Sequence, residues 1–494
     1  MRSAVIGELP RTQRLDALEA WYNGNAYSVG LYAKPYAWDQ EHDGTGKRIK
    51  LEDRRPKQYN LARKIVDTPA GWLFGYENFP GIEAENDEIT ENWIAVLSEA
   101  VKLPSAMLKA AKAGGKCGTA VLVFKVVQGY PRIEHLPAKH CTRRVGPDGE
   151  SLEWLRYQYK APASYFEELG YTGLERDKDY WYRREYDPNG EYHYHLAPVS
   201  EDGTPPVFVE DAENTVTHNL GVLAAVWVRN LEGDDEVDGE ATYAGVIDLL
   251  DEANKLVSLA TRSIRKQSDP TLAYTGVEDP DDLPEQQRIG SSSGGSIVSP
   301  GDAKILEIDG SGQAAAKEWV DRLREAVQEI TRSGTPDPEK LSGQSQSGYA
   351  LRILHGPLVA LVGELRLTYG PALIHFVRLM LRVVSLLPTG SVILPRPVEG
   401  ALNPDAVLSL KWGDYFAPTP QDIKTEIETL AAAVTLKMLS LETAQARVAF
   451  LYGVEDVAGE ATRIQREQGA DPDHDGAEEA LQALEGQPRE GDDE

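Results

Sequence analysis

The segment that comes nearest to a catalytic motif is AKAGGKCGT, residues 111–119. It is similar to a phosphate-binding loop, but the first glycine of that motif is missing at the required spacing. Cys117 also stands where a Ser or Thr hydroxyl would have to meet a magnesium ion. A glycine-rich turn between a helix and a strand is therefore the favoured interpretation.

Other residues have types that bind ligands in some proteins. His135, His140 and Cys141 lie close together in the sequence, but no second pair of ligands has the spacing of a zinc site. The basic and aromatic run 180–186 would suit the stacking of bases, yet a half-exposed hairpin explains it equally well. The acids of 202–214 include no evident acid–base pair. The sequence therefore predicts no catalytic centre, no metal and no cofactor.

Charge and cysteine content exclude several classes of protein. The 494 residues carry a formal net charge of −28, the opposite of what a protein needs to grip DNA phosphates. Two cysteines cannot build a disulfide framework, and the N-terminus lacks the layout of a signal peptide, so we expect a reducing cytoplasm. The most apolar run, 371–388, is interrupted by His375, Arg378 and Arg382, which favours a buried helix over a membrane span.

The rest of the chain is organised around residues 238–332. Two helical runs, 239–267 and 313–332, each carry one apolar stripe at spacings of three and four residues. Between them, 268–312 contains strand-like pieces broken by Asp-Pro, Gly-Gly and Pro-Gly turns. This order predicts an arm rather than a globular enzyme core. The stripes consist of Val246, Leu249, Leu250, Ala253, Leu256, Val257, Ala260 and Ile264, and of Trp319, Val320, Leu323, Ala326, Val327 and Ile330.

Before the arm, a run of helical patterns is followed by a run of strand patterns, which predicts the α+β class. A short amphipathic helix opens it, a second helix ends near Pro69, and a helical hairpin over 88–112 is divided by Pro104. From Gly118 to Tyr194 the period changes to two, with GPDGE and DPNGE as hairpin turns, so we expect an antiparallel sheet domain.

After the arm, residues 334–348 contain almost no apolar anchor, and loops of that length are usually functional or disordered. A long helix follows, in which Pro357 and Pro371 predict kinks. Three helices are expected within 419–468. The tail from Gly469 has ten acids and one base, which predicts disorder.

The order of several short motifs resembles the portal proteins of tailed double-stranded DNA bacteriophages, in the form with chains of about 500 residues. Segments 21–24 and 60–75 are similar to the opening of that family, and 246–258 is similar to the start of its first stem helix. Segment 347–351 resembles the entry to its long kinked helix, and 419–467 resembles its C-terminal helices. The residues that carry the resemblance include Asn60, Ile65, Val66, Asp67, Trp72, Asp248, Asp251, Asn254 and Ser258.

The resemblance covers about residues 10–468 and implies a homo-oligomeric ring, usually a dodecamer, at one capsid vertex. Double-stranded DNA would be packaged and ejected through it, and it would dock the terminase and later the head–tail adaptor, beside the major capsid and scaffolding proteins. The implied location is the virion, after assembly in the host cytoplasm, with no membrane. The implied parts are a wing over 1–235, a first stem helix over 236–267, a clip over 268–312, a second stem helix over 313–333, a tunnel loop over 334–347, a kinked helix with wing strands over 348–418, a crown over 419–468 and a disordered acidic tail over 469–494.

The resemblance also implies which residues meet DNA and partners. Each stem helix has as many acids as bases in the predicted ranges 239–267 and 313–332, and a neutral stem suits a duplex that must slide without being held. The tunnel loop would face the channel, and the clip would meet terminase or adaptor. The candidates are Lys340, Leu341, Ser342, Gln344, Ser345 and Gln346 in the tunnel loop; Lys255, Arg262, Arg265, Arg322 and Arg324 in the stem; and Asp281, Asp282, Glu285, Gln286 and Arg288 in the clip.

Two other functions stay open at this point. One is a hydrolase-like enzyme on an unfamiliar α+β scaffold, which would need an acid–base pair in a cleft. The other is a capsid-associated structural protein that forms no ring. The mass of the native particle would separate them.

Overall fold

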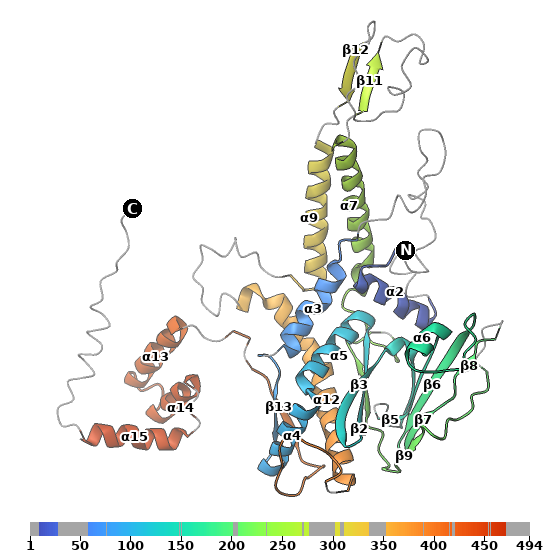
Figure 1. The fold of residues 1–494 in the computed structure, drawn as a ribbon. Coiled ribbons are helices and arrows are strands. Elements are labelled where there is room, and N and C mark those ends of the chain that lie inside the picture. Colours follow the sequence, from blue (N-terminus) through green and yellow to red (C-terminus); the bar gives the residue numbers. More distant parts are fainter. Residues whose placement is uncertain are drawn as a thin grey trace. The chain divides into compact units, whose positions relative to one another are not determined.

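The computed structural model describes residues 9–27, 58–268, 271–275, 302–306, 311–334, 352–413 and 415–470, apart from positions 76, 148, 150, 201–205, 234, 389, 417–419, 453 and 455. The chain forms two compact units (Figure 1). One comprises residues 1–338 and 355–415, and the other comprises 339–354 and 416–494. Helices and strands both contribute substantially, which confirms the α+β class.

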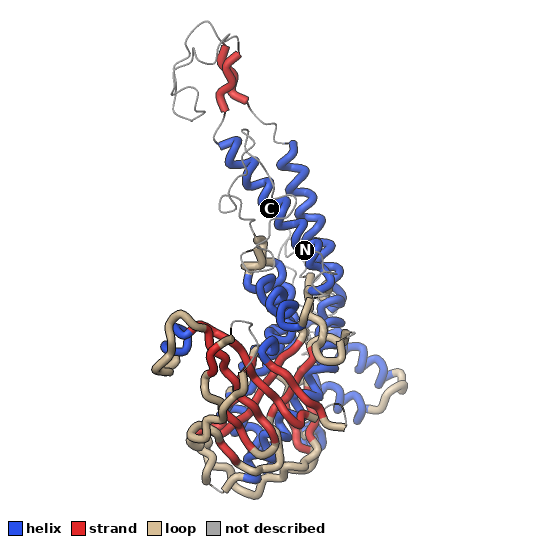
Figure 2. Tube along the Cα trace, turned by 90° about the vertical axis from the view of Figure 1, so that its right-hand side faces the viewer, coloured by secondary structure: helices blue, strands red, loops and turns tan. Residues whose placement is uncertain are grey.

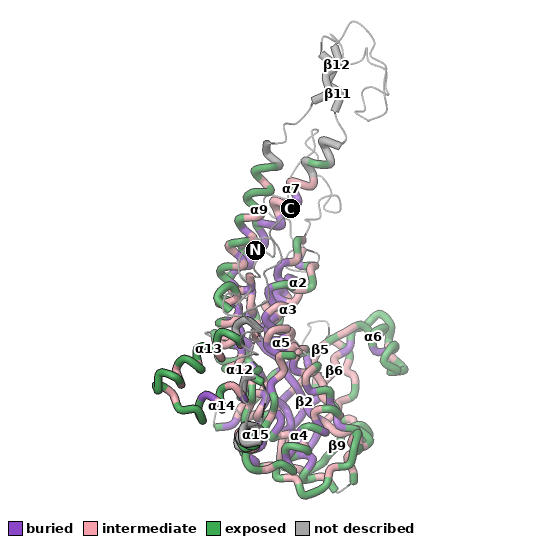
Figure 3. The backbone as a smooth tube through the Cα atoms, turned by 90° about the vertical axis from the view of Figure 1, so that its left-hand side faces the viewer, coloured by how far each residue is buried: buried purple, intermediate pink, exposed green. Residues whose placement is uncertain are grey.

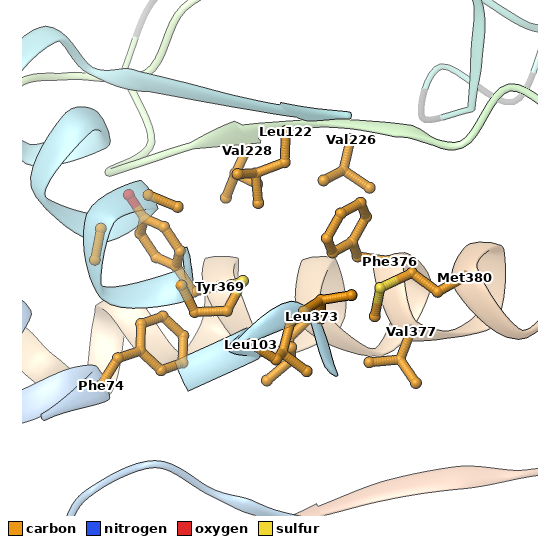
Figure 4. Packing of buried hydrophobic residues seen from close by; sticks show 14 of the residues in the cluster. Phe74, Leu103, Leu122, Val226, Val228, Tyr369, Leu373, Phe376, Val377 and Met380 are labelled. Atoms are coloured by element: carbon orange, nitrogen blue, oxygen red, sulfur yellow. The ribbon is translucent and has the colours of Figure 1, made fainter. Parts of the chain in front are cut away.

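The main core of the first unit lies between a three-stranded antiparallel sheet and several helices. Figure 4 shows Phe376 and Tyr369 of the long helix α12 reaching toward the sheet residues Val226 and Val228. The sheet has the strand order β10-β2-β3. Its strands are β10 (Ala225–Arg229), β2 (Thr119–Val127) and β3 (Tyr130–Leu136), and the helices around it are α3 (Leu61–Phe74), α4 (Glu88–Val101), α5 (Leu103–Cys117) and α12 (Gly356–Leu386).

Helix α12 forms one side of this core. Residues at spacings of three and four, including Leu358, Leu365 and Phe376, are almost fully buried, so one complete face of the helix packs inward. The helix continues through Pro371, where a kink or break is predicted from the sequence. Of the described helices, α12 is the one that is long and apolar enough to cross a membrane. Its inward face is occupied by the core, as in the central helix of a globular domain.

A second sheet lies beside the first and appears with it in Figure 2. The strands predicted between 118 and 194 are present, but they divide between the two sheets instead of forming one. The reason is that β2 takes β10 as a partner, while a short turn at Ala138–His140 carries the chain into the second sheet. That sheet has the order β4-β5-β6-β7-β9, with β8 paired to β6. Its strands are β4 (Cys141–Val145), β5 (Leu152–Pro162), β6 (Asp179–Asp187), β7 (Gly190–His193), β8 (Ala197–Pro198) and β9 (Val216–Thr217), and helix α6 (Ala163–Glu168) follows β5.

Arg184 ties the two sheets together. Its side chain is 8% exposed, and its guanidinium donates to Glu134 of β3 at 2.5 Å and to Glu191 of β7 at 3.2 Å. Burial alone would raise the pKa of Glu191, but the hydrogen bond from His193 and the charges of Arg184 and Lys125 outweigh it and lower that pKa to about 2. The carboxylate is therefore ionised at neutral pH, and the buried arginine has a permanent counter-charge.

Helices α7 (Ile247–Ser268) and α9 (Ser311–Ile330) run side by side (Figures 1 and 2). Between them the described residues form the antiparallel pair β11 (Thr271–Thr275) and β12 (Asp302–Leu306). Helix α7 begins at Ile247, later than the positions 236 and 239 expected from the sequence. The preceding residues are held in a different conformation, because Ala241 and Tyr243 are buried in a core with helix α2 (Arg11–Asn23).

The second unit contains helices α13 (Pro420–Thr435), α14 (Leu441–Leu451) and α15 (Val457–Ala470). They enclose an apolar groove of about 570 Å³, lined by residues such as Ile427, Leu430, Val448 and Ile464. Among its described hydrophobic residues only Ala444 and Ala449 are buried. The three predicted C-terminal helices are present, but in this single chain they bury little apolar surface. The strand pair β1 (Gly81–Ala84) and β13 (Leu408–Lys411) belongs to the first unit.

Candidate assembly and channel surfaces of the helical arm

The base of α7 is anchored by polar side chains that are themselves buried. The Tyr27 hydroxyl donates to Asp251 Oδ1 at 2.6 Å, and the backbone N–H of Tyr59 donates to Asn254 Oδ1 at 2.7 Å. Ser258 is also buried and donates to the carbonyl of Asn254 at 2.7 Å. Asp251, Asn254 and Ser258 are residues on which the portal resemblance rests. Asp251 and Asn254 hold the arm to the N-terminal segments, and Ser258 bonds within α7.

Tyr243 fills the space beneath the arm. Its side chain is fully buried, and its hydroxyl donates within the core to the carbonyls of Leu18 and Lys116, the latter at 3.0 Å. Burial raises the pKa of Tyr243 well above its ordinary value, so the hydroxyl remains a neutral donor. One aromatic side chain thus joins helices α2 and α5 to the segment that leads into α7.

Within the acidic string 232–240, the described residues Asp235 and Asp238 form a clasp of ion pairs with helix α2. Asp238 is 1% exposed and accepts from Arg11 at 2.7 and 2.9 Å, from Arg14 at 3.1 Å and from Thr119 Oγ1 at 3.0 Å. Nearby, the guanidiniums of Arg11 and Arg143 lie over the Trp227 ring. The clasp connects α2, β2 and β10 at the point where the chain turns toward the arm. Sequence alone gave no signal for which acid of the string would be buried.

The glycine-rich segment 111–119 is a packing site. A Cβ at Gly114 would lie 1.9 Å from the Tyr369 hydroxyl, and a Cβ at Gly118 would lie 2.0 Å from the Gly239 carbonyl oxygen. The Tyr369 hydroxyl donates to Asn230 Oδ1 at 3.1 Å. The glycines therefore allow α12 and the clasp to approach α5 closely, and the segment ends a helix instead of opening a phosphate loop.

The apolar stripes of the arm are buried at its base and exposed along the outer turns (Figure 3). Leu250 and Val327 are buried in the same core as Tyr243, and Ala253 is buried as well. Further along the two helices, Leu259, Ile264 and Trp319 are each about half exposed, as is Ile330 at the other end of α9. The α7–α9 pair alone does not cover the stripes that the sequence predicts.

The predicted stem cations have mixed surroundings. Lys255 pairs with Asp251 and Glu252 on its own helix, and Arg322 pairs with Glu318 at 2.6 Å. Arg324 is half-buried, and its Nε has no hydrogen-bond partner among the described residues. The side chains of Arg262 and Arg265 lie outside the described part. So do the tunnel-loop candidates Lys340, Leu341, Ser342, Gln344, Ser345 and Gln346, and the clip candidates Asp281, Asp282, Glu285, Gln286 and Arg288.

The described residues hold no group of three His, Cys, Asp or Glu side chains placed to bind a metal. Burial raises the pKa of both Cys117 and Cys141 to about 12, so each stays a protonated thiol. His140 packs against the rings of Tyr157 and Tyr159. These side chains contribute to packing. The described residues thus form a scaffold in which the helices α7 and α9 keep part of their apolar surface exposed.

The sequence profile of the family described as "Phage portal protein, SPP1 Gp6-like" matches residues 7–473. The chain belongs to this family. It is a phage portal protein, and portal proteins are structural components rather than enzymes. The hydrolase-like alternative is thereby set aside.

Solved structures similar to this portal protein come from gene transfer agent particles. The chain in "Virion of native gene transfer agent (GTA) particle" has 10% sequence identity and a TM-score of 0.39, over 79% of this chain and 89% of that chain. The chain in "Neck of native GTA particle computed with C12 symmetry" has 11% identity and a TM-score of 0.34, over 79% and 88% of the two chains. No curated protein matches this sequence.

Proposed function

We propose that this portal protein assembles head-to-tail into a closed ring of about twelve subunits, the number usual in the family. The ring occupies one capsid vertex of the virion, after assembly in the host cytoplasm, and double-stranded DNA is packaged and ejected through its axial channel. In this assignment α7 and α9 are the stem, 268–312 is the clip and 334–347 is the tunnel loop. Residues 1–235 and 348–418 form the wing, and 419–468 form the crown.

The observation that carries the proposal is the incomplete burial of the arm. Leu259, Ile264, Trp319 and Ile330 are 47%, 52%, 50% and 59% exposed, although all four belong to the apolar stripes. Several large apolar side chains left exposed on one pair of helices mark an interaction site. A ring places the arm of the next subunit against these side chains, and a head-to-tail contact that closes needs no further partner.

The charge of the arm suits a channel for DNA. Helix α7 has four bases and three acids, and α9 has three bases and four acids, so together they are neutral. A duplex carries about one charge per 1.7 Å, so a strongly basic lining would hold it through the release of many counterions. A neutral lining whose bases are tied to acids, as Lys255 and Arg322 are, lets the duplex slide.

The remaining candidates take their roles from this arrangement. Lys340 is the one base among the tunnel-loop candidates and would touch phosphates without reading sequence. Leu341 would pack against the loop of the next subunit, and the neutral polar residues around it would give flexibility. The clip acids Asp281, Asp282 and Glu285, with Gln286 and Arg288, would meet the terminase during packaging and the head–tail adaptor afterwards. The capsid and scaffolding proteins would contact the wing.

Native mass spectrometry and electron microscopy of the purified full chain test the proposal. Rings of about twelve copies are expected, and a double variant Leu259→Ser with Trp319→Ser should reduce the ring fraction without changing the melting temperature of the monomer. Leu169→Ser is the matched control, because Leu169 is 57% exposed but lies outside the arm. Compact monomers of the wild type at every salt concentration would overturn the ring.

A further inference from the structure

Helix α12 has an outward face that becomes basic toward its C-terminal end. Its exposed residues recur at spacings of three and four, opposite the face that packs into the core. The C-terminal half of this face carries Arg378 and Arg382, and neither forms an ion pair with any residue that the structure describes. The other half is more apolar and includes Leu367, which is 77% exposed.

Helix α4 has an outward face of the opposite charge. Its inward side is defined by Thr90, Ile94 and Leu97, which are buried. On the other side Glu88, Glu91 and Glu99 are exposed, and none of these carboxylates has a cation partner within the described ranges. The face is therefore acidic at both ends of the helix.

Helix macrodipoles account for only part of this distribution, since Glu88 and Glu91 lie in the first turn of α4 but Glu99 does not. The dipole favours cations in the last turn of a helix and anions in the first turn, and its effect fades within one turn. Arg378 lies two turns before the end of α12 at Leu386. Glu99 lies in the last turn of α4, which ends at Val101, and there the dipole disfavours a carboxylate. The helix dipole therefore explains neither the position of Arg378 nor that of Glu99.

The two helices pack at different edge strands of the same sheet. Helix α12 packs against β10 and α4 packs against β3, and these are the two edge strands of the β10-β2-β3 sheet. A head-to-tail ring needs two different, complementary patches on different sides of each subunit. A basic helix face and an acidic helix face at opposite edges of one core meet that requirement.

We infer that the outward face of α12 in one subunit binds the outward face of α4 in the next, with Arg378 and Arg382 against Glu88, Glu91 and Glu99. The inference rests on the proposed ring and names a contact that orders its subunits. Charge complementarity selects the partner face, since two α12 faces or two α4 faces would place like charges together. Leu367 supplies apolar surface to be covered by the same contact.

Charge reversal tests this pairing. The first variant is Arg378→Glu with Arg382→Glu, and the second is Glu91→Arg with Glu99→Arg. Each alone should lower the ring fraction at least tenfold, while an equimolar mixture restores rings in which the variants alternate in equal numbers, as native mass spectrometry would show. Arg176→Glu with Arg396→Glu is the charge-matched control, since both arginines are exposed and lie outside the two helices.

The possible outcomes separate this inference from the ring itself. If both variants form rings as the wild type does, the α12–α4 contact is wrong and the ring stands. If the wild type forms no ring, the proposed function fails. If each variant is monomeric with an unchanged melting temperature but neither the mixture nor a single chain carrying all four substitutions forms rings, the two faces do not pair with each other.

Discussion

Arg332 and Glu364 form a two-point ion pair that joins the end of α9 to α12. Nη1 and Nη2 of the arginine each lie 2.6 Å from one carboxylate oxygen. Their hydrogen bonds raise the pKa of Arg332 and lower that of Glu364. Because the two side chains are 35% and 51% exposed, solvent screens the pair, and its contribution to stability is at most about 1 kcal/mol. Its effect is geometric, since it holds the chain just before segment 335–351 against the helix that follows.

Deleting residues 340–346 should therefore spare folding and ring assembly while impairing DNA translocation or genome retention. The flanking helices keep their own packing in the cores around Val327 and Leu358. DNA packaged per particle and DNA retained after purification are the measurements. Replacing the seven residues by a Gly-Ser segment of equal length is the control that separates loop chemistry from loop length. Normal packaging and retention in the deletion would exclude a channel role.

Changing Asp281 and Asp282 to lysine should weaken terminase or adaptor binding without altering the ring. The reason is that the substitution reverses charge in a segment that we assign to partner contacts. Pull-down of the terminase and tail joining measure the effect. Asp177→Lys with Asp179→Lys changes the charge equally at exposed positions elsewhere. Unchanged packaging and tail joining would show that the assignment is wrong.

Asp238→Asn should destabilise the first unit by about 3–5 kcal/mol, because it removes the charge that two arginines share in a buried site. Asp235→Asn is the matched control. Asp235 also pairs with Arg14, but it is 35% exposed, so the expected loss is under about 1 kcal/mol. Denaturant unfolding of the monomer compares the two variants, and similar losses would contradict the clasp.

Gly114→Ala should cost about 1–3 kcal/mol or more, because the new methyl group would overlap the Tyr369 hydroxyl in a packed core. Gly71→Ala should have the opposite effect on stability. Gly71 lies within helix α3 with no atom near its would-be Cβ, so alanine should stabilise by about 0.5–1 kcal/mol. Thermal melting distinguishes the two. Equal tolerance of both substitutions would argue against close packing of α5 on α12.

Glu19→Gln should lower the free energy of unfolding at neutral pH. The loss should be smaller at acidic pH. Burial would raise the pKa of Glu19, but hydrogen bonds and charge from Lys116 and Lys139 outweigh it and lower the pKa from 4.5 to about 2. A carboxylate with a lowered folded-state pKa stabilises fully above its ordinary pKa and loses that contribution as pH falls through the folded value. The deficit of the variant should be about 3 kcal/mol at pH 7 and shrink between pH 4.5 and 2. A deficit independent of pH would contradict this account.

The sequence by itself determined most of the helices and the strands between Gly118 and Tyr194. Apolar spacing in 247–268, 311–330 and 356–386 is a local property, and each of these segments is helical. The family followed from the order of short motifs, and the profile match confirms it. The same local reasoning placed the start of α7 too early, because the polar anchors of Asp251 and Asn254 and the burial of Tyr243 depend on distant segments.

Tertiary structure decided what the polar and glycine residues do. Asp238 is one of several acids in a row, and only the approach of Arg11 and Thr119 from elsewhere in the chain makes it the buried one. Gly114 is needed because Tyr369 arrives from a helix more than two hundred residues away. Periodicity records which face of an element is apolar, but the energy of a buried charge or a close contact depends on partners that only the folded chain brings together.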